Sequence, residues 1–337
     1  YPVYGANGVI GRYDTYNHSE AQLLLTCRGA TCGSVNISSG KCWVTGNAMV
    51  IRPRTSDIDL QYLAYYFMGG VDLSSVISGS AQPQITRKSL NPVLLRYPPK
   101  AEQERIVEIL NQAIYAIDTA TENTQKNLAN TEELFQNHLH QVFELAKKSP
   151  ESWVQTTLGE VCDMYQPKSI SKRHFVPDGL YPVYGANGII GQYDQYNHSD
   201  IQLLITCRGA TCGAINQTNG KCWVNGNAMV VKPQYSAINR DYLAYYFKGA
   251  VNLSSFVTGA AQPQLTRTSL RSIPLRYPDL ERQKTMVKEF EKVRVEIDAI
   301  RSVYRMKLRE LSALRASVLK KAFTGRLINP AQLPVKA

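Results

Sequence analysis

The fold of this chain is constrained most strongly by an internal repeat, because segment 1–8 recurs unchanged at 181–188. When residues 1–100 are aligned with residues 181–280, 65 of the 100 positions are identical. Many of the differences exchange one aliphatic side chain for another, as Val9 for Ile189, and packed cores tolerate such exchanges. A repeat of this length is a domain duplication rather than a solenoid unit, so we expect two heads of the same fold.

Each copy carries the sequence pattern of a mixed domain. Short apolar runs such as 22–26 and 48–51 are separated by Gly-rich turns, which predicts strands. Segments 62–67 and 242–247 have helical spacing, and so do the stretches that follow Thr86 and Thr266. We therefore expect an α/β fold of the mixed α+β type for each head.

Each copy is followed by a segment poor in Gly and Pro, after Pro98-Pro99 and after Pro278. Apolar residues recur there at spacings of three and four, the pattern of a coiled-coil seam. The first segment is rich in Glu and the second in Lys and Arg, which favours pairing between them. We predict two long helices that form an antiparallel coiled coil, separate the heads and relate them by an approximate two-fold axis. The expected seam consists of Ile106, Leu110, Ala113, Ile117, Ala120, Thr124, Leu128, Thr131, Phe135, Leu139 and Val142, and of Phe290, Val293, Ile297, Ile300, Tyr304, Leu308, Leu311, Leu314, Val318 and Ala322.

These patterns divide the chain into five parts. We expect the first head at residues 1–98, a helical spacer at 99–148, the second head at 149–280, a second spacer at 281–325 and a tail at 326–337. The second head begins with a leading segment, residues 153–180, that has no counterpart before Tyr1. We therefore expect the first head to lack a strand or to be less stable.

The charge balance indicates a polyanionic partner. The formal net charge is +11 and the pI is near 9.2, and nucleic acid is the commonest polyanion that such proteins bind. The sequence has no run of about 18 apolar residues and no signal-like start, so we expect no membrane partner and a cytoplasmic location. Its seven cysteines, an odd number, favour reduced thiols over a disulfide framework.

Two repeated loops carry side chains suited to reading base edges. An arginine beside a Gly-rich turn, Arg28 or Arg208, can enter a groove, where guanine is the commonest partner of arginine. A second loop holds glutamines, whose amides suit adenine, around a rigid proline. A surface loop without a DNA contact is an equally good interpretation of the arginines. The candidate DNA-binding residues are Arg28, Thr31, Gln82, Gln84 and Arg87 in the first head and Arg208, Thr211, Gln262, Gln264 and Arg267 in the second.

Two further elements add candidates for DNA binding. Asn7 and Asn187 lie in Gly-Ala-Asn-Gly segments, whose spacing favours a tight hairpin turn over a phosphate-binding loop. The tip of such a hairpin can still touch DNA. The leading segment adds a basic cluster suited to phosphate contacts, with a solvated loop as the alternative. This cluster consists of Lys168, Ser169, Lys172 and Arg173, next to His174.

Neither a metal site nor a catalytic site is predicted. Cys27, Cys32 and Cys42 recur 180 residues later, but their spacing lacks the short Cys-x-x-Cys knuckle of structural zinc sites. We therefore expect them to be small buried residues. The sequence shows no Gly-rich methyl-donor loop, no Asn-Pro-Pro-Tyr motif and no Walker A motif. We expect this chain to have no catalytic residue.

The order of the motifs resembles that of the specificity (S) subunits of type I restriction-modification enzymes, over essentially the whole chain. The motifs that carry the resemblance are Leu158-Gly-Glu-Val, segments 181–188 and 208–213, Asn227-Ala-Met-Val, segment 261–266, Glu281-Arg-Gln and segment 319–325. The resemblance implies two target recognition domains, each of which reads one half of a gapped DNA site. It also implies two methyltransferase (M) subunits and restriction (R) subunits as partners. S-adenosylmethionine, ATP and magnesium would bind to those partners, and no cofactor to this chain.

The near-identity of the two heads is unusual for this family, whose heads usually differ. We therefore hypothesise that both half-sites are the same short sequence on opposite strands, so that the whole site is an interrupted palindrome. Two other functions stay open from the sequence. In one the chain is the remnant of a fused restriction-methylation enzyme, and would itself transfer methyl groups. In the other it is a coiled-coil scaffold whose heads bind protein, and would ignore DNA even with partners present.

Overall fold

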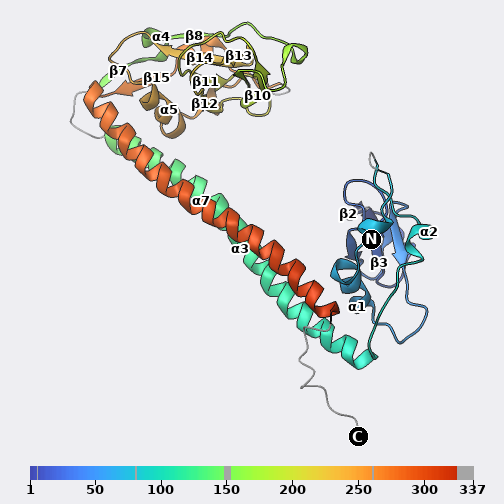
Figure 1. The fold of residues 1–337 in the computed structure, drawn as a ribbon. Coiled ribbons are helices and arrows are strands. Elements are labelled where there is room, and N and C mark those ends of the chain that lie inside the picture. The colour runs from blue at the N-terminus through green and yellow to red at the C-terminus, as the bar shows by residue number, and fades with distance from the viewer. Residues whose placement is uncertain (6, 80–81, 148–152, 260–261, 325–337) are drawn as a thin grey trace. The chain divides into compact units, whose positions relative to one another are not determined.

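The chain forms two compact units in the computed structural model, which describes residues 1–5, 7–79, 82–147, 153–259 and 262–324 (Figure 1). Unit 1 consists of Tyr1–Lys126 and Tyr304–Ala337, and unit 2 of Asn127–Val303. Each unit therefore contains one head together with parts of both long helices.

Unit 2 is built around a four-stranded antiparallel sheet with the strand order β12-β11-β14-β8. All four residues of the central strand β11 (Leu203–Thr206) are buried, as its aliphatic sequence favours. Helix α5 (Arg240–Gly249) packs on this sheet, and Asn239 caps it by accepting hydrogen bonds from the backbone of Asp241 and Tyr242. The other strands are β12 (Ile215–Gln217), β14 (Ala228–Pro233) and β8 (Cys162–Tyr165).

Two smaller sheets complete the second head. Strand β9 (Tyr181–Gly185) forms a hairpin with β10 (Gly188–Tyr193) and pairs in parallel with β13 (Trp223–Val224). Strand β7 (Val154–Thr157) pairs antiparallel with β15 (Pro274–Tyr277). The short helices are α4 (Leu158–Val161) and α6 (Arg267–Arg271), with 3-10 turns at Lys172–His174 and Leu253–Phe256.

Unit 1 repeats this architecture with one strand fewer in its main sheet. That sheet has the order β4-β3-β6, and within the described residues no strand takes the place of β8. The prediction of a mixed fold for each head is thereby confirmed. The elements are β1 (Pro2–Gly5), β2 (Gly8–Arg12), β3 (Leu23–Thr26), β4 (Val35–Ile37), β5 (Trp43–Val44), β6 (Ala48–Ile51), α1 (Leu60–Tyr65), a π-helical turn (Tyr66–Gly70), a 3-10 turn (Ser74–Val76) and α2 (Arg87–Leu90).

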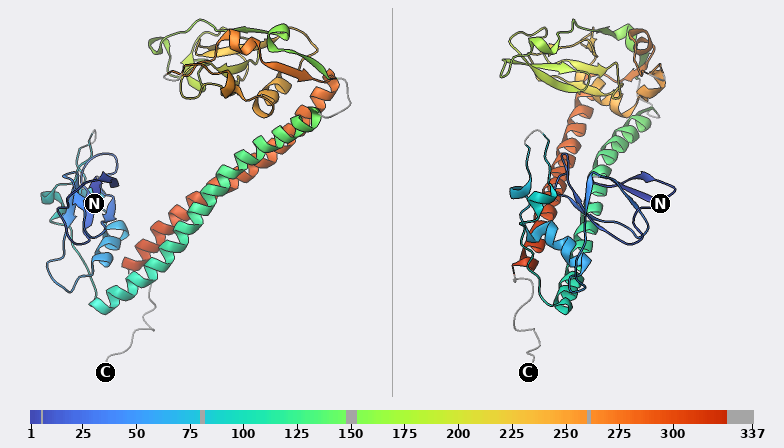
Figure 2. Two further views of the ribbon diagram at one scale, coloured as in Figure 1. Left: turned by 180° about the vertical axis from the view of Figure 1, so that it is seen from behind. Right: turned by 90° about the vertical axis from the view of Figure 1, so that its right-hand side faces the viewer.

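The two long helices, α3 (Lys100–Lys147) and α7 (Leu280–Phe323), run side by side and antiparallel within each unit (Figure 2). In unit 2, Phe290 packs on Phe143 with ring centroids 5.5 Å apart, and Arg301 donates to Glu132 at 2.7 Å. In unit 1, Ile106, Leu110 and Ile114 of α3 pack with Leu319 and Ala322 of α7. The predicted antiparallel pairing is confirmed within each unit.

The predicted seam of α7 is wrong at two positions. Ile300 and Leu314 are 44% and 49% exposed, whereas the neighbouring Arg301 and Arg315 bind the acidic residues Glu132 and Asp118 of α3. On α3 the predicted Ala113 and Val142 are half-buried, and their neighbours Ile114 and Phe143 are buried instead. A spacing of three or four residues allows either Ile300 or Arg301, and either Leu314 or Arg315, to face α3. The carboxylates of Glu132 and Asp118 on α3 favour the arginine in each case.

A buried glutamine fixes each head to the start of its own long helix. The amide nitrogen of Gln103 donates to the carbonyl oxygens of Asp57 and Pro98, both at 2.8 Å, and its oxygen accepts from the N–H of Asp59 at 2.9 Å. In unit 2, Gln283 makes the same contacts with Ala237, Pro278 and Asn239. Both side chains are fully buried, and a buried amide without partners would be costly. The joint between head and helix is therefore specific.

Candidate nucleic-acid interface

Two loops lie side by side in each head, and we call them the paired loops. In unit 2, residues 207–213 follow β11 and pair with the described residues of a second loop, 258–259 and 262–266. The N–H of Gly209 donates to Pro263 O at 3.2 Å, and Arg208 stands opposite Gln264 in this pairing. In unit 1 the paired loops are residues 27–33 and the described residues 78–79 and 82–86. Arg28 lies opposite Gln84, and the N–H of Gly29 donates to Pro83 O at 3.0 Å.

The paired loops present the side chains that the sequence suggested for base reading. Opposite residues of an antiparallel pair place their side chains on one face. A guanidinium and a carboxamide therefore share a face in each head, from residues that are far apart in the sequence. Arg28, Gln82, Gln84, Arg87, Arg208, Thr211, Gln262, Gln264 and Arg267 are exposed, and Thr31 is half-buried.

Arg87 and Arg267 are each held in a fixed place after the paired loops. Each is the first residue of a short helix, α2 or α6, whose start is closed by a capping box. In unit 1 the Thr86 hydroxyl accepts from the N–H of Ser89 at 3.1 Å, and the Ser89 hydroxyl oxygen accepts from the N–H of Thr86 at 3.0 Å. Since Ile85 just before them is buried, the backbone that carries Arg87 is anchored to the core.

Asn7 and Asn187 are exposed at the tips of the hairpins β1–β2 and β9–β10, so the predicted hairpin turns are confirmed. In unit 2 the tip touches the main sheet, because Asn187 Oδ1 accepts from Asn216 at 3.3 Å and the Thr206 hydroxyl donates to Ala186 O. Thr206 directly precedes the paired loops. The hairpin tip of unit 2 therefore lies beside them.

The basic cluster of the leading segment is also fastened beside the paired loops of unit 2. Gln166 donates to Gly226 O and to the sulfur of Cys207, both at 2.9 Å. The Ser169 hydroxyl oxygen accepts from the N–H of Gly226 at 3.0 Å, so this residue anchors the loop. The remaining members, Lys168, Lys172 and Arg173, are exposed. In unit 2 the two paired loops, the hairpin tip at Asn187 and the basic cluster thus lie near one another, around Arg208.

The repeated cysteines pack and bond inside the heads. The thiols of Cys27 and Cys207 donate to the carbonyl oxygens of Asn47 and Asn227 at 3.2 and 3.1 Å. Burial raises the pKa of the Cys207 thiol, and metal binding requires a thiolate. Over the residues that the structure describes, no three His, Cys, Asp or Glu side chains gather into a metal site. In the same residues no helix is long and apolar enough to cross a membrane.

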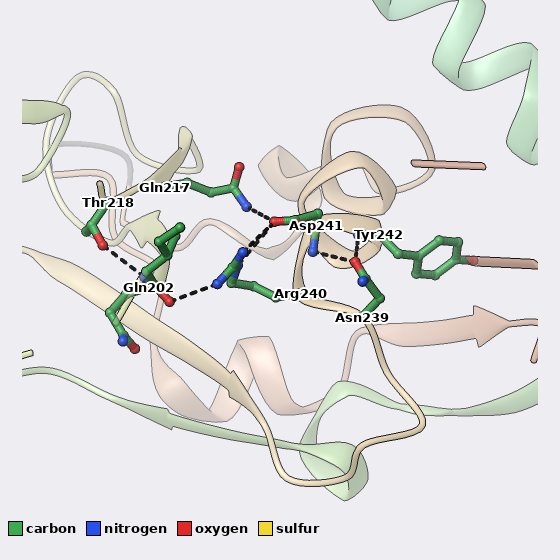
Figure 3. A network of polar contacts seen from close by, with 8 residues as sticks. Gln202, Gln217, Thr218, Asn239, Arg240, Asp241 and Tyr242 are labelled. Atoms are coloured by element: carbon green, nitrogen blue, oxygen red, sulfur yellow. Dashed lines mark hydrogen bonds and ion pairs between the residues drawn. The ribbon is translucent and has the colours of Figure 1, made fainter. Parts of the chain in front are cut away.

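Figure 3 shows a polar network in unit 2 that the sequence reasoning missed. Asp241 accepts from Gln217 at 2.7 Å and from Arg240 at 3.0 Å, which ties the start of α5 to β12. In unit 1 the counterparts of Gln217, Arg240 and Asp241 are Ile37, Leu60 and Gln61. The sequence did carry a signal for this network, because all three positions differ together between two copies that are otherwise alike.

The chain was compared with known proteins by sequence. A family model described as the type I restriction modification DNA specificity domain matches residues 1–130 and residues 150–301. The specificity subunit of the type I restriction enzyme EcoprrI from Escherichia coli is 31% identical over 155 residues, which are 45% of this chain and only 38% of that protein. A putative specificity subunit of the type I restriction enzyme MjaX from Methanocaldococcus jannaschii is 22% identical over 315 residues, 83% of this chain and 71% of that protein.

The fold also has a counterpart among solved structures. A chain from a study of complex assembly and conformational transition of the type I R-M system superposes with a TM-score of 0.72 at 20% identity. The match covers 92% of this chain and 83% of that chain. The fold of this chain is therefore a known one.

Proposed function

Because the chain belongs to the family of type I restriction modification DNA specificity domains, we propose that it is the DNA-reading subunit of a type I restriction-modification complex. Each head reads one half of a bipartite DNA site. The net charge of +11 suits a polyanionic partner.

The paired loops carry this proposal. Each brings an exposed arginine opposite an exposed glutamine, Arg28 with Gln84 and Arg208 with Gln264. Arginine binds guanine in the major groove through two hydrogen bonds, and glutamine binds adenine in the same way.

The chemistry of the complex belongs to other subunits. S-adenosylmethionine would bind to methyltransferase subunits, and ATP and magnesium to restriction subunits, while this chain supplies the sequence specificity. The long helices offer surface for such partners, because several large apolar side chains on them are exposed. These are Tyr115, Leu134 and Leu145 on α3 and Val295, Ile300, Val303, Met306 and Leu314 on α7. Since both units carry such residues, two methyltransferase subunits would bind.

The two heads would read the same half-site. Every candidate residue in the paired loops of unit 1 has an identical counterpart in unit 2. Equal side chains on equal backbones select equal bases, so the complete site is an interrupted palindrome.

The proposal is tested by co-expressing the chain with type I methyltransferase subunits from the same organism and mapping methylated adenines across the genome. We expect methylation at one gapped motif, which disappears in the double variant Arg28→Ala with Arg208→Ala. Arg54→Ala removes an equal charge from an exposed position outside the paired loops and should leave the map unchanged. No methylated motif would reject the proposal, and methyl transfer by the isolated chain would show that it is itself an enzyme.

A further inference from the structure

The hairpin of each head exposes two aliphatic side chains in a row, and we call them the apolar pair. In unit 2 they belong to strand β10 (Figure 1), where Ile189 is 59% exposed and Ile190 is 44% exposed. In unit 1, Val9 and Ile10 of β2 are 59% and 67% exposed. Valine and isoleucine are both aliphatic and branched at Cβ, so the two heads present the same kind of surface.

A β-bulge distinguishes the apolar pair from the residues of an ordinary strand. In unit 2 the register of β9 and β10 shifts between Ile189 and Gly191, so that Ile190 stands opposite no residue. In unit 1 the pairing of β1 and β2 skips Ile10 in the same way. Bulges bend a strand and redirect its side chains, and they are frequent beside functional sites. Both apolar pairs therefore have the same local backbone.

A glycine on the opposite strand holds the bulged side chain in place. A Cβ added to Gly185 would lie 2.7 Å from Cγ2 of Ile190, and one added to Gly5 would lie 2.9 Å from Cγ2 of Ile10. The bulged isoleucine thus lies against the backbone, in space that glycine leaves open. One side of the isoleucine is packed and the other is exposed. A side chain fixed in this way loses little freedom when a ligand covers it.

In unit 2 the apolar pair lies close to the paired loops. The turn before β10 is tied to the main sheet, because the Thr206 hydroxyl donates to Ala186 O and Asn187 Oδ1 accepts from Asn216 at 3.3 Å. The first paired loop, which carries Arg208, directly follows Thr206. The hairpin of unit 1 pairs with β5 as that of unit 2 pairs with β13. The apolar pair is therefore continuous with the candidate nucleic-acid interface.

The charge around the apolar pair of unit 2 favours DNA as its partner. The basic cluster, in which Lys168, Lys172 and Arg173 are exposed, is fastened beside the same paired loops. Positive charge of this kind attracts the phosphate backbone. An apolar surface bordered by basic side chains thus suits a ligand that is anionic outside and carries an apolar group within its groove.

Thymine presents such a group. Its C5 methyl is an apolar group at a base edge in the major groove, and apolar side chains contact it there. Glutamine reads adenine in the same groove, and every adenine of a duplex is paired with a thymine. The bases suited to Gln84 and Gln264 therefore bring a methyl group into the same groove.

We propose that the apolar pair of each head contacts the C5 methyl group of a thymine, next to the bases that the paired loops read. This inference rests on the proposed function and adds to it a requirement for an A·T pair in each half-site. The contact removes the methyl group and the aliphatic side chains from water. Burial of one methyl group strengthens binding about fourfold.

The test replaces each thymine of the methylated site in turn by uracil, which lacks only the C5 methyl group. The chain, purified with its methyltransferase subunits, is titrated with each duplex at fixed salt. We expect at least one position in each half-site where uracil weakens binding about fourfold. Binding to the unchanged duplex tests the proposed function itself, so a failure there is distinguished from a failure of this inference.

A serine variant identifies the side chains that contact the methyl group. It combines Val9→Ser, Ile10→Ser, Ile189→Ser and Ile190→Ser. It should bind thymine and uracil duplexes equally, and should bind the uracil duplexes as tightly as the unmodified protein does, which also shows that it is folded. The matched control is Ile201→Ser, because Ile201 is 41% exposed but precedes β11, whereas the paired loop follows that strand. This control should keep the preference for thymine.

Three results would overturn the proposal. Uracil could have no effect at any position, the site could contain no thymine, or the serine variant could still distinguish thymine from uracil. Loss of the methyltransferase subunits from the serine variant during purification would also overturn it, since the apolar pair would then bind protein.

Discussion

The two heads have nearly the same sequence, yet the same strand is buried to different depths in them. Residues 228–231 of β14 are at most 2% exposed, while residues 48–51 of β6 are all half-buried. The difference arises from β8, which pairs with β14 and has no counterpart beside β6 among the described residues. Burial of a strand is therefore set by its neighbours as much as by its own side chains.

The heads differ much less on the surface proposed to read DNA. Arg28 and Gln84 face each other as Arg208 and Gln264 do, on equivalent backbone contacts. The polar network around Asp241 distinguishes the heads, but it lies between α5 and β12 rather than in the paired loops. The comparison thus separates the main sheets, whose burial differs between the heads, from the paired loops, which are alike in both.

The largest expected effect comes from the segment that closes unit 2. Leu158→Ala removes a fully buried side chain from the main core and should lower the free energy of unfolding of unit 2 by about 2–5 kcal/mol. Hydrogen exchange at Leu203–Thr206 reports this loss, and Leu23–Thr26 of unit 1 should stay unchanged. Leu180→Ala, at a position 76% exposed, is the control and should have little effect. An equal acceleration of hydrogen exchange in both heads would contradict this expectation.

A smaller effect should appear equally in both heads. Arg28→Ala and Arg208→Ala each remove one arginine from the paired loops, and each should cost about 1–3 kcal/mol of DNA-binding free energy. The affinity of the purified complex for its site, measured at fixed salt, checks this. A large loss for one arginine and none for the other would show that the heads read DNA differently.

Alkaline pH should lower the stability of unit 1 through its buried Tyr62. Burial raises the pKa of Tyr62 to about 12, whereas an unfolded tyrosine titrates near 10. The unfolded state therefore releases its proton first, and the stability present below about pH 10 is lost as the pH rises toward 12. Tyr62→Phe should remove part of this decline, at a cost of about 1 kcal/mol at neutral pH from the lost hydrogen bond to Arg96 O. Urea unfolding at several pH values measures both the alkaline loss of stability and the cost at neutral pH. If the free energy of unfolding of the variant fell with pH as steeply as that of the unmodified protein, Tyr62 would not be the group responsible.

The smallest effects are expected where the long helices pair. Glu132 binds Arg301 at 2.7 Å and Arg294 at 3.7 Å, while Asp118 binds only Arg315 among the described residues. The Arg301 side chain is 21% exposed and that of Arg315 40%, so water screens the second pair more. Glu132→Gln should lower the free energy of unfolding by about 1 kcal/mol and Asp118→Asn by a few tenths. Thermal unfolding at low and high salt measures both, and the reverse order would be inconsistent with this difference.

The sequence predicted the architecture well because the repeat and the periodic patterns are local signals. The strands, the hairpins at Asn7 and Asn187 and the two long helices all follow from spacing and turn residues. The prediction of the coiled-coil seam was wrong at Ile300. Local spacing allowed either Ile300 or Arg301 to face the other helix, and the carboxylate of Glu132 on that helix favours Arg301. The structural role of Gln103 was missed for a similar reason, since its three partners come from other parts of the chain.

The candidate residues were predicted individually, but their grouping was not. Arg28 and Gln84 are far apart in the sequence, and only the backbone pairing of their loops shows that they share a face. Ser169 was expected to contact phosphate, and its hydroxyl oxygen also accepts from the backbone of Gly226, a positioning contact that the sequence did not indicate. Long-range pairing of this kind leaves no periodic trace in a single sequence.

The claim that both heads read the same half-site is tested most directly by DNA selection. The chain, purified with its methyltransferase subunits, would select binding sites from a duplex library with two randomised blocks. We predict sites in which the second half is the inverted copy of the first, separated by a fixed gap. Two unlike half-sites would contradict the account, because equal paired loops would then select different bases.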